Sequence, residues 1–158
     1  MAINQGDKAP GFTLAAKPGE TVDVNEHIGK EPVVLLFFPL AYSPVCTDEM
    51  CAMRDAWSDW SSLDAKVFGI SVDSPFVTDK FRGDYDIPFP ILSDFNKDVS
   101  AKYGALHEDL MGLKGVSKRA AFVIGPDGTV AYEWVSDDPS KMPDFDAVRS
   151  AVSQTVGA

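Results

Sequence analysis

The feature that most constrains the fold is a run of six apolar residues, Val33 to Phe38, enclosed between Pro32 and Pro39. A run this short, rich in β-branched and aromatic side chains, is typical of a strand that is buried on both faces of a parallel sheet. A second buried strand is predicted over 66–72. Parallel neighbours need a long crossover, usually a helix, and apolar residues recur at helical spacing from 45 to about 62. The sequence therefore predicts an α/β protein.

The remaining turn signals and periodicities complete a mixed sheet. Strands are predicted at 12–14 and 21–24, and again at 120–124 and 129–135, and each pair is separated by a glycine-containing turn. Helices are predicted at 75–82, 96–103 and 144–156, and prolines favour an extended chain over 87–92. Strands that alternate with helices and end in a hairpin resemble the thioredoxin-like architecture, a central mixed β-sheet flanked by helices. We expect one such domain over residues 1–158.

The charge and the cysteine count limit the possible partners and compartment. Twenty-four acidic and fourteen basic residues give a net charge of −10, which repels phosphate backbones, so we expect no binding to nucleic acid. The sequence has no basic and apolar leader and no apolar run near the ~20 residues that span a membrane. Two cysteines in such a chain favour a cytoplasmic location, where thiols stay reduced. The acidic surface suits either a salt-rich cytoplasm or simply a soluble protein.

Cys46 lies where the strand predicted at 33–38 gives way to a helix. Pro44 suits the first helical turn and Ser43 suits the N-cap position before it. The thiol is therefore expected at a helix N-terminus, whose free N–H groups and dipole favour the thiolate, the nucleophilic form. Pro39 and Pro44 would stiffen and shield this loop. The pattern predicts redox chemistry at Cys46.

Two further side chains can assist that thiolate. Arg119 stands just before the predicted strand 120–124, from which a permanently charged fork of donors could reach the strand-end site. The hydroxyl of Ser43, three residues before Cys46, can reach the thiol or an oxygen bound near it. Such donors would stabilise the charge that builds on the leaving oxygen of a peroxide. Attack by the Cys46 thiolate would give a sulfenic acid and release water or an alcohol.

Cys51, five residues further on, is the second thiol of the chain. It can condense with a sulfenic acid at Cys46 to form a disulfide. On an intact α-helix, however, residues five apart are offset by roughly 140° and face apart. A Cys46–Cys51 disulfide therefore requires the first helical turns to unwind, and we expect this order-to-disorder step. Alternatively, Cys51 is a core residue on the inner face of the helix.

These residues resemble a known family. The spacing Pro39-x-x-x-Ser43-x-x-Cys46 is similar to the peroxiredoxin signature Pro-x-x-x-Thr/Ser-x-x-Cys. The resemblance continues through the segments 6–14, 33–39, 69–73 and 88–94, and through Arg119 before AFVI. It implies that Cys46 is the peroxidatic cysteine and that Pro39, Ser43 and Arg119 share its site. It also implies that Glu49 helps to hold Arg119.

Within that family, Cys51 resembles the resolving cysteine of the bacterioferritin-comigratory-protein type. The remainder of the chain also resembles the one-cysteine alkyl hydroperoxide reductase E type. The resemblance implies reduction of hydrogen peroxide and organic hydroperoxides by a monomer or homodimer. It further implies recycling by a thioredoxin-like or glutaredoxin-like reductant.

Three alternatives remain open from the residues. If Cys51 is structural, the chain is a one-cysteine peroxidase or a redox sensor. A thiol–disulfide oxidoreductase is the third, although that chemistry usually uses Cys-x-x-Cys. We expect no metal and no cofactor, because His27 and His107 have no ligand spacing with the cysteines, and neither a P-loop nor a dinucleotide-binding glycine loop is present.

Overall fold

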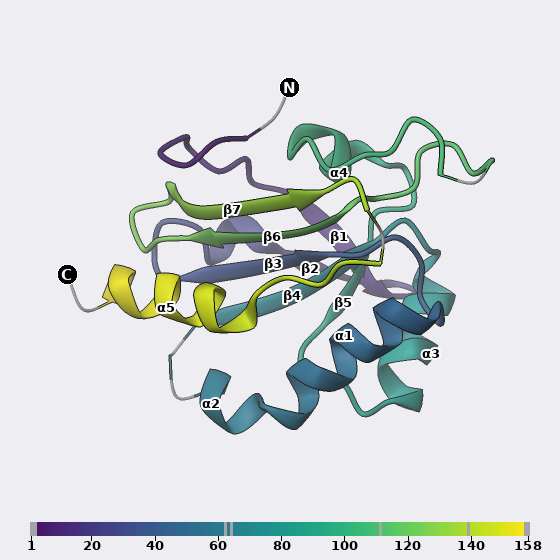
Figure 1. Ribbon diagram of the computed structural model, residues 1–158, viewed down its shortest axis with the longest axis horizontal. Coiled ribbons are helices and arrows are strands. Elements are labelled where there is room, and N and C mark those ends of the chain that lie inside the picture. The colour runs from purple at the N-terminus through teal and green to yellow at the C-terminus, as the bar shows by residue number, and fades with distance from the viewer. Residues whose placement is uncertain (1–2, 62, 64, 111, 139, 157–158) are drawn as a thin grey trace.

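The computed structural model describes residues 3–61, 63, 65–110, 112–138 and 140–156, and its sheet has seven strands in the order β2-β1-β5-β4-β3-β6-β7 (Figure 1). The strands are β1 Thr13–Lys17, β2 Glu20–Asp23, β3 Val33–Phe37, β4 Lys66–Ser71, β5 Ile91–Ser93, β6 Arg119–Ile124 and β7 Val130–Ser136. The helices are α1 Pro44–Asp55, α2 Trp57–Ser61, α3 Pro75–Asp84, α4 Asp98–Lys102 and α5 Phe145–Val156, with a short 3-10 helix at Val24–Glu26.

The interior of the sheet is built from β3, β4 and β6. β3 pairs in parallel with β4 and antiparallel with β6, and β4 pairs in parallel with β5. Every residue of β3 is buried, as is every residue of β4 after the first. The predicted buried strands at 33–38 and 66–72 are therefore confirmed, and so is the mixed sheet.

The apolar run of β3 serves two cores at once. Side chains at even positions join one core and those at odd positions join the other, because successive strand residues point to opposite faces. The first core holds Val34, Leu36 and Phe38 together with Met50 of α1, Trp60 of α2, Phe81 of α3 and Val148 of α5. The second holds Val33, Leu35 and Phe37 together with Phe12, Val99 and Tyr103. Since both faces are covered, the strand has no place for alternating polar residues.

The outer elements also match the sequence patterns. β1 and β2 form an antiparallel hairpin, and β6 and β7 form another. α3 begins at Pro75, where the Ser74 hydroxyl oxygen accepts a hydrogen bond from the Val77 N–H at 3.4 Å. α4 is shorter than predicted and ends before Gly104, which has a left-handed φ of 70°. α5 begins at Phe145, one residue later than expected.

One prediction is wrong in detail, because the single helix expected from 45 to about 62 is two helices. α1 ends at Asp55, Ala56 leaves the helical conformation with φ −99° and ψ 14°, and α2 starts at Trp57. The Trp57 ring packs against Phe89, with ring centroids 5.6 Å apart, and this contact lies at the break. The apolar spacing of three and four runs through the break unchanged, so the pattern carries no sign of it. Ser62 lies outside the described residues.

Two glycines on neighbouring elements provide a test of the packing. A Cβ at Gly69 in β4 would lie 2.7 Å from Ile91 Cδ1, whereas a Cβ at exposed Gly83 in α3 would have nothing within 4 Å. Gly69→Ala should lower the free energy of unfolding by about 1–2 kcal/mol, since the tight core must shift. Gly83→Ala should raise it by up to about 1 kcal/mol, since alanine favours the helix. Urea unfolding of both variants checks this, and shifts of the same sign would contradict it.

Candidate active site

The sheet brings the start of β6 beside the end of β3. The two strands are antiparallel, with Phe37 opposite Ala120, so Arg119 lies at the edge where β3 ends. The chain leaves that edge through Pro39 and enters α1 at Pro44, which places Cys46 in the first helical turn. Two segments far apart in the sequence thus meet at one strand end, as the strand pattern predicted.

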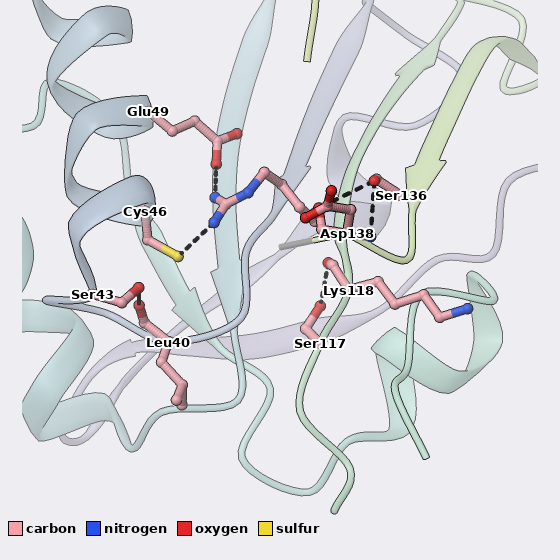
Figure 2. A network of polar contacts seen from close by, with 9 residues as sticks. Leu40, Ser43, Cys46, Glu49, Ser117, Lys118, Ser136 and Asp138 are labelled. Atoms are coloured by element: carbon pink, nitrogen blue, oxygen red, sulfur yellow. Dashed lines mark hydrogen bonds and ion pairs between the residues drawn. The ribbon is translucent and has the colours of Figure 1, made fainter. Parts of the chain in front are cut away.

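At this edge of the sheet, one buried guanidinium contacts both a thiol and a carboxyl group. Arg119 Nη2 donates a hydrogen bond to Cys46 Sγ at 3.1 Å, and Arg119 Nη1 donates one to Glu49 Oε1 at 2.6 Å (Figure 2). The side chains are almost fully enclosed, with exposed fractions of 0% for Cys46, 1% for Arg119 and 0% for Glu49. The structure therefore brings together Cys46, Arg119 and Glu49, three of the residues that the sequence placed in one site.

Ser43 differs from its expected local role. Its backbone is extended at the N-cap position, but the side chain makes no capping bond to the helix. Instead the hydroxyl donates to the carbonyl oxygen of Leu40 at 2.7 Å, across the turn that leads into α1 (Figure 2). The N-cap prediction is thus right for the backbone and wrong for the hydroxyl. The hydroxyl therefore donates to the turn, and no helical N–H group donates to its oxygen.

A cavity of about 220 Å³ opens beside this cluster. Its lining consists of Pro39, Leu40, Ser43, Pro44, Val45, Leu110, Arg119 and Ser140. Cys46 is not itself among these lining residues, but it follows Val45 in the chain and bonds Arg119, and both of these residues line the cavity. A larger hollow of about 540 Å³ lies elsewhere, around Ser74, Asp94 and Phe95, but neither a cysteine nor an arginine lines it. The smaller cavity is therefore the one that adjoins the partners of the thiol.

The chain is similar in sequence and in fold to proteins of one known family. The AhpC/TSA family profile matches residues 5–133. The peroxiredoxin bcp of Coxiella burnetii is 37% identical over 85% of this chain and 89% of its own length. The chloroplastic 2-cysteine peroxiredoxin of Chattonella marina is 33% identical over 87% of this chain and 73% of its own. The crystal structure of BcpB from Mycobacterium tuberculosis superposes with a TM-score of 0.81 at 30% identity, over 98% of this chain and 97% of that one.

The chain belongs to the AhpC/TSA family. It is a peroxiredoxin, a thiol peroxidase of the bacterioferritin-comigratory-protein kind with a thioredoxin-like fold. Among the described residues, no group of three or more His, Cys, Asp and Glu side chains could hold a metal ion, and no helix is long and apolar enough to cross a membrane.

The second cysteine of this peroxiredoxin lies on the same helix as the first. Cys46 and Cys51 are both within α1 and both are free thiols. Cys46 is buried and Cys51 is half-buried. Residues five apart on a continuous helix face apart, so the two sulfurs can join only if part of α1 unwinds.

The cavity also contains residues that the sequence did not indicate. Leu110 comes from the irregular segment 105–118, where Leu110 and Leu113 form an isolated bridge. Ser140 comes from the chain beyond β7. Neither segment has a periodic pattern, so no sequence signal places them at the site.

The two charged partners perturb one another. Burial raises the pKa of Glu49 to about 7, although the Arg119 guanidinium opposes this shift. Glu49 Oε2 is buried without a hydrogen-bond partner among the described residues, which explains why one ion pair does not offset the burial. Burial lowers the pKa of Arg119, but Glu49 and Cys46 outweigh it, so the pKa is raised overall and the guanidinium stays charged.

The raised pKa of Glu49 predicts a pH dependence of stability. A carboxyl that holds its proton more tightly when folded contributes stability below its unfolded value of 4.5, and this is lost as the pH rises through about 7. Reduced wild type should therefore lose on the order of 2 kcal/mol relative to Glu49→Gln between pH 4.5 and 8. Urea unfolding across this range measures the difference. Asp48→Asn, at the exposed neighbouring position, is the control and should show no such trend; a pH-independent difference for Glu49→Gln would contradict the shift.

Proposed function

We propose that this peroxiredoxin reduces hydrogen peroxide and organic hydroperoxides at Cys46. The observation that carries the proposal is the 3.1 Å contact between Cys46 Sγ and the Arg119 guanidinium in the first turn of α1, behind a small cavity. A fixed positive charge and the free amides of a helix start both favour the thiolate. The thiolate attacks one peroxide oxygen, the O–O bond breaks, and the leaving oxygen takes up a proton as water or an alcohol.

Arg119 and Ser43 have distinct roles in this proposal. Arg119 holds the thiolate and offers donors to the peroxide, where charge develops on the leaving oxygen. Glu49 keeps the guanidinium in place through the 2.6 Å ion pair. Ser43 lines the cavity, and its hydroxyl oxygen can accept a hydrogen bond from the substrate while it donates to Leu40. Pro39 lines the same cavity.

Cys51 acts in the second step. The Cys51 thiol condenses with the Cys46 sulfenic acid, so that an S–S bond forms and water leaves. A dithiol protein of the thioredoxin or glutaredoxin type then reduces the disulfide to two thiols. We place this cycle in a reducing cytoplasm, where thiols are kept reduced, and expect a monomer or a homodimer to run it. The five-residue spacing disfavours a general disulfide oxidoreductase, because the bridge requires α1 to unwind.

The apolar lining of the cavity favours organic substrates. Leu40, Val45 and Leu110 present hydrocarbon side chains beside Arg119, the sole charged residue among those that line it. An alkyl or aryl group would bury apolar surface there, which hydrogen peroxide lacks. The organic substrate should therefore gain binding from the wall, whereas the reacting O–O group uses the same polar contacts in both.

The intact mass of the protein after one equivalent of peroxide tests the cycle. Wild type should lose two hydrogen atoms as the disulfide forms, and Cys51→Ser should instead gain one oxygen as a sulfenic acid. Cys46→Ser should remain unmodified and inactive in a peroxide-consumption assay. If Cys46→Ser keeps activity, the proposal is wrong. If wild type itself gains one oxygen, Cys51 is structural and the protein is a one-cysteine peroxidase or a redox sensor.

Removal of Leu110 tests the substrate preference. Leu110→Ala should raise KM for cumene hydroperoxide by about three- to tenfold, in proportion to the lost apolar contact, and leave KM for hydrogen peroxide nearly unchanged. Leu113→Ala is the matched control, because Leu113 pairs with Leu110 but is exposed and does not line the cavity. Steady-state kinetics with both peroxides measures the ratio. Equal effects of Leu110→Ala on the two substrates would show that the wall does not select.

A further inference from the structure

The loop before α1 is tied to the neighbouring α3 region at two points. The Ala41 N–H donates to Asp73 Oδ2 at 2.7 Å, and the Tyr42 hydroxyl donates to Asp84 Oδ2 at 2.7 Å. Asp84 is the last residue of α3. The loop that leads into the helix with both cysteines is therefore held by hydrogen bonds to Asp73 and Asp84.

The hydrogen bond from Tyr42 comes from a residue with an unusual backbone conformation. Tyr42 has a φ of 69°, in the left-handed region that a bulky side chain rarely adopts. Its ring lies 5.2 Å from the Phe81 ring and 6.2 Å from the Tyr85 ring, centroid to centroid. Such a backbone conformation persists only where its surroundings enforce it. Here the enforcing contacts are these rings and the bond to Asp84.

The charges around Tyr42 keep this bond intact near neutral pH. Lys80 Nζ donates to both oxygens of Asp84 at 2.9 and 3.1 Å, and lowers the pKa of Asp84 together with the Tyr42 hydroxyl. Burial and the neighbouring Asp84 raise the pKa of Tyr42 to about 12. The phenol thus remains the donor and the carboxylate remains the acceptor over the working range of the enzyme.

The other end of α1 is held to the same part of the molecule. Arg54 Nη1 donates to the Tyr85 carbonyl oxygen at 2.9 Å, just beyond the end of α3. Tyr42 and Arg54 therefore bracket the stretch that contains both cysteines. Unwinding of the first turns of α1 moves Cys46 toward Cys51. This movement must displace the loop at Tyr42, whereas Arg54 can remain in place.

We propose that Tyr42 is a positioning residue, and that its release from Asp84 accompanies the unwinding that brings the Cys46 sulfenic acid to Cys51. This inference rests on the disulfide step proposed above. Two reactions compete for the sulfenic acid. Condensation with Cys51 forms the disulfide and water, whereas a second peroxide oxidises it to a sulfinic acid and leaves as water or an alcohol. A stronger hydrogen bond between Tyr42 and Asp84 delays disulfide formation and so favours oxidation to the sulfinic acid.

Tyr42→Phe tests the tie, because it keeps the ring and removes only the hydroxyl. Rapid mixing with peroxide, followed by mass analysis, should show the sulfenic acid converting to disulfide about three- to tenfold faster, as expected for loss of one charge-assisted hydrogen bond. The yield of sulfinic acid in excess peroxide should fall by a similar factor. Tyr85→Phe is the control: its ring lies in the same cluster, but its hydroxyl has no hydrogen bond among the described residues.

Asp84→Ala provides a second route to the same bond. It should accelerate disulfide formation as Tyr42→Phe does, and the double variant should be no faster than either alone, because both changes remove one interaction. Additive effects would mean that the two residues act separately and would overturn the proposal. So would an unchanged or slower disulfide step in Tyr42→Phe.

A background without Cys51 separates this inference from the proposed cycle. In Cys51→Ser, the sulfenic acid persists and dimedone, a bulky carbon nucleophile, can capture it only when the buried Cys46 becomes exposed. Adding Tyr42→Phe should speed capture by the same three- to tenfold or so, since the same hydrogen bond is lost. If no variant forms a disulfide, the Cys51 step fails and this capture rate alone decides the role of Tyr42. An unchanged capture rate overturns it.

Discussion

The structure of this site depends on one buried positive charge shared by two acids. A guanidinium removed from water is costly unless it is paired, and Arg119 meets that requirement by bonding Cys46 on one side and Glu49 on the other. The net charge of these three groups is zero when either the thiol or the carboxyl group keeps its proton. Because the pKa of Glu49 is raised to about 7, the carboxyl can hold that proton near neutrality. The guanidinium charge is then available to the sulfur rather than being offset by the carboxylate.

The proposed disulfide step places two opposing requirements on helix α1. Its first turn must be ordered to present Cys46 to Arg119, but it must come apart for the sulfur to reach Cys51. Several features of α1 limit the free energy that its unwinding costs. The Ser43 hydroxyl does not cap it, Tyr42 enters it through a strained backbone, and Ala56 ends it after twelve residues. A longer, capped and unstrained helix would hold Cys46 equally well but would cost more free energy to unwind.

The sequence was informative wherever a local rule coincided with the tertiary structure. The apolar run at 33–38 contains β3, Pro44 is the first residue of α1, and Arg119 is the first residue of β6. The parts that could not be predicted depend on contacts between segments distant in the chain. Trp57 packing on Phe89 accompanies the break at Ala56, and Leu110 reaches the cavity from an irregular segment with no period. Hydrophobic patterning predicts which face of an element is buried. Neither the helix break nor the position of Leu110 changes that face, so the pattern reveals neither of them.

The distribution of charge affects the peroxide substrate and the reductant protein differently. The chain carries a net charge of −10, yet Arg119 is the one charged residue among those that line the cavity, and it bonds the buried Cys46 and Glu49. A neutral hydroperoxide crosses the acidic surface without repulsion and meets hydrocarbon and a few polar donors. A reductant protein must instead dock on that surface, where acidic groups repel an acidic partner and salt screens the repulsion. In the proposed cycle, ionic strength should therefore act on the reduction of the disulfide far more than on its formation, because only the reduction requires two charged surfaces to meet.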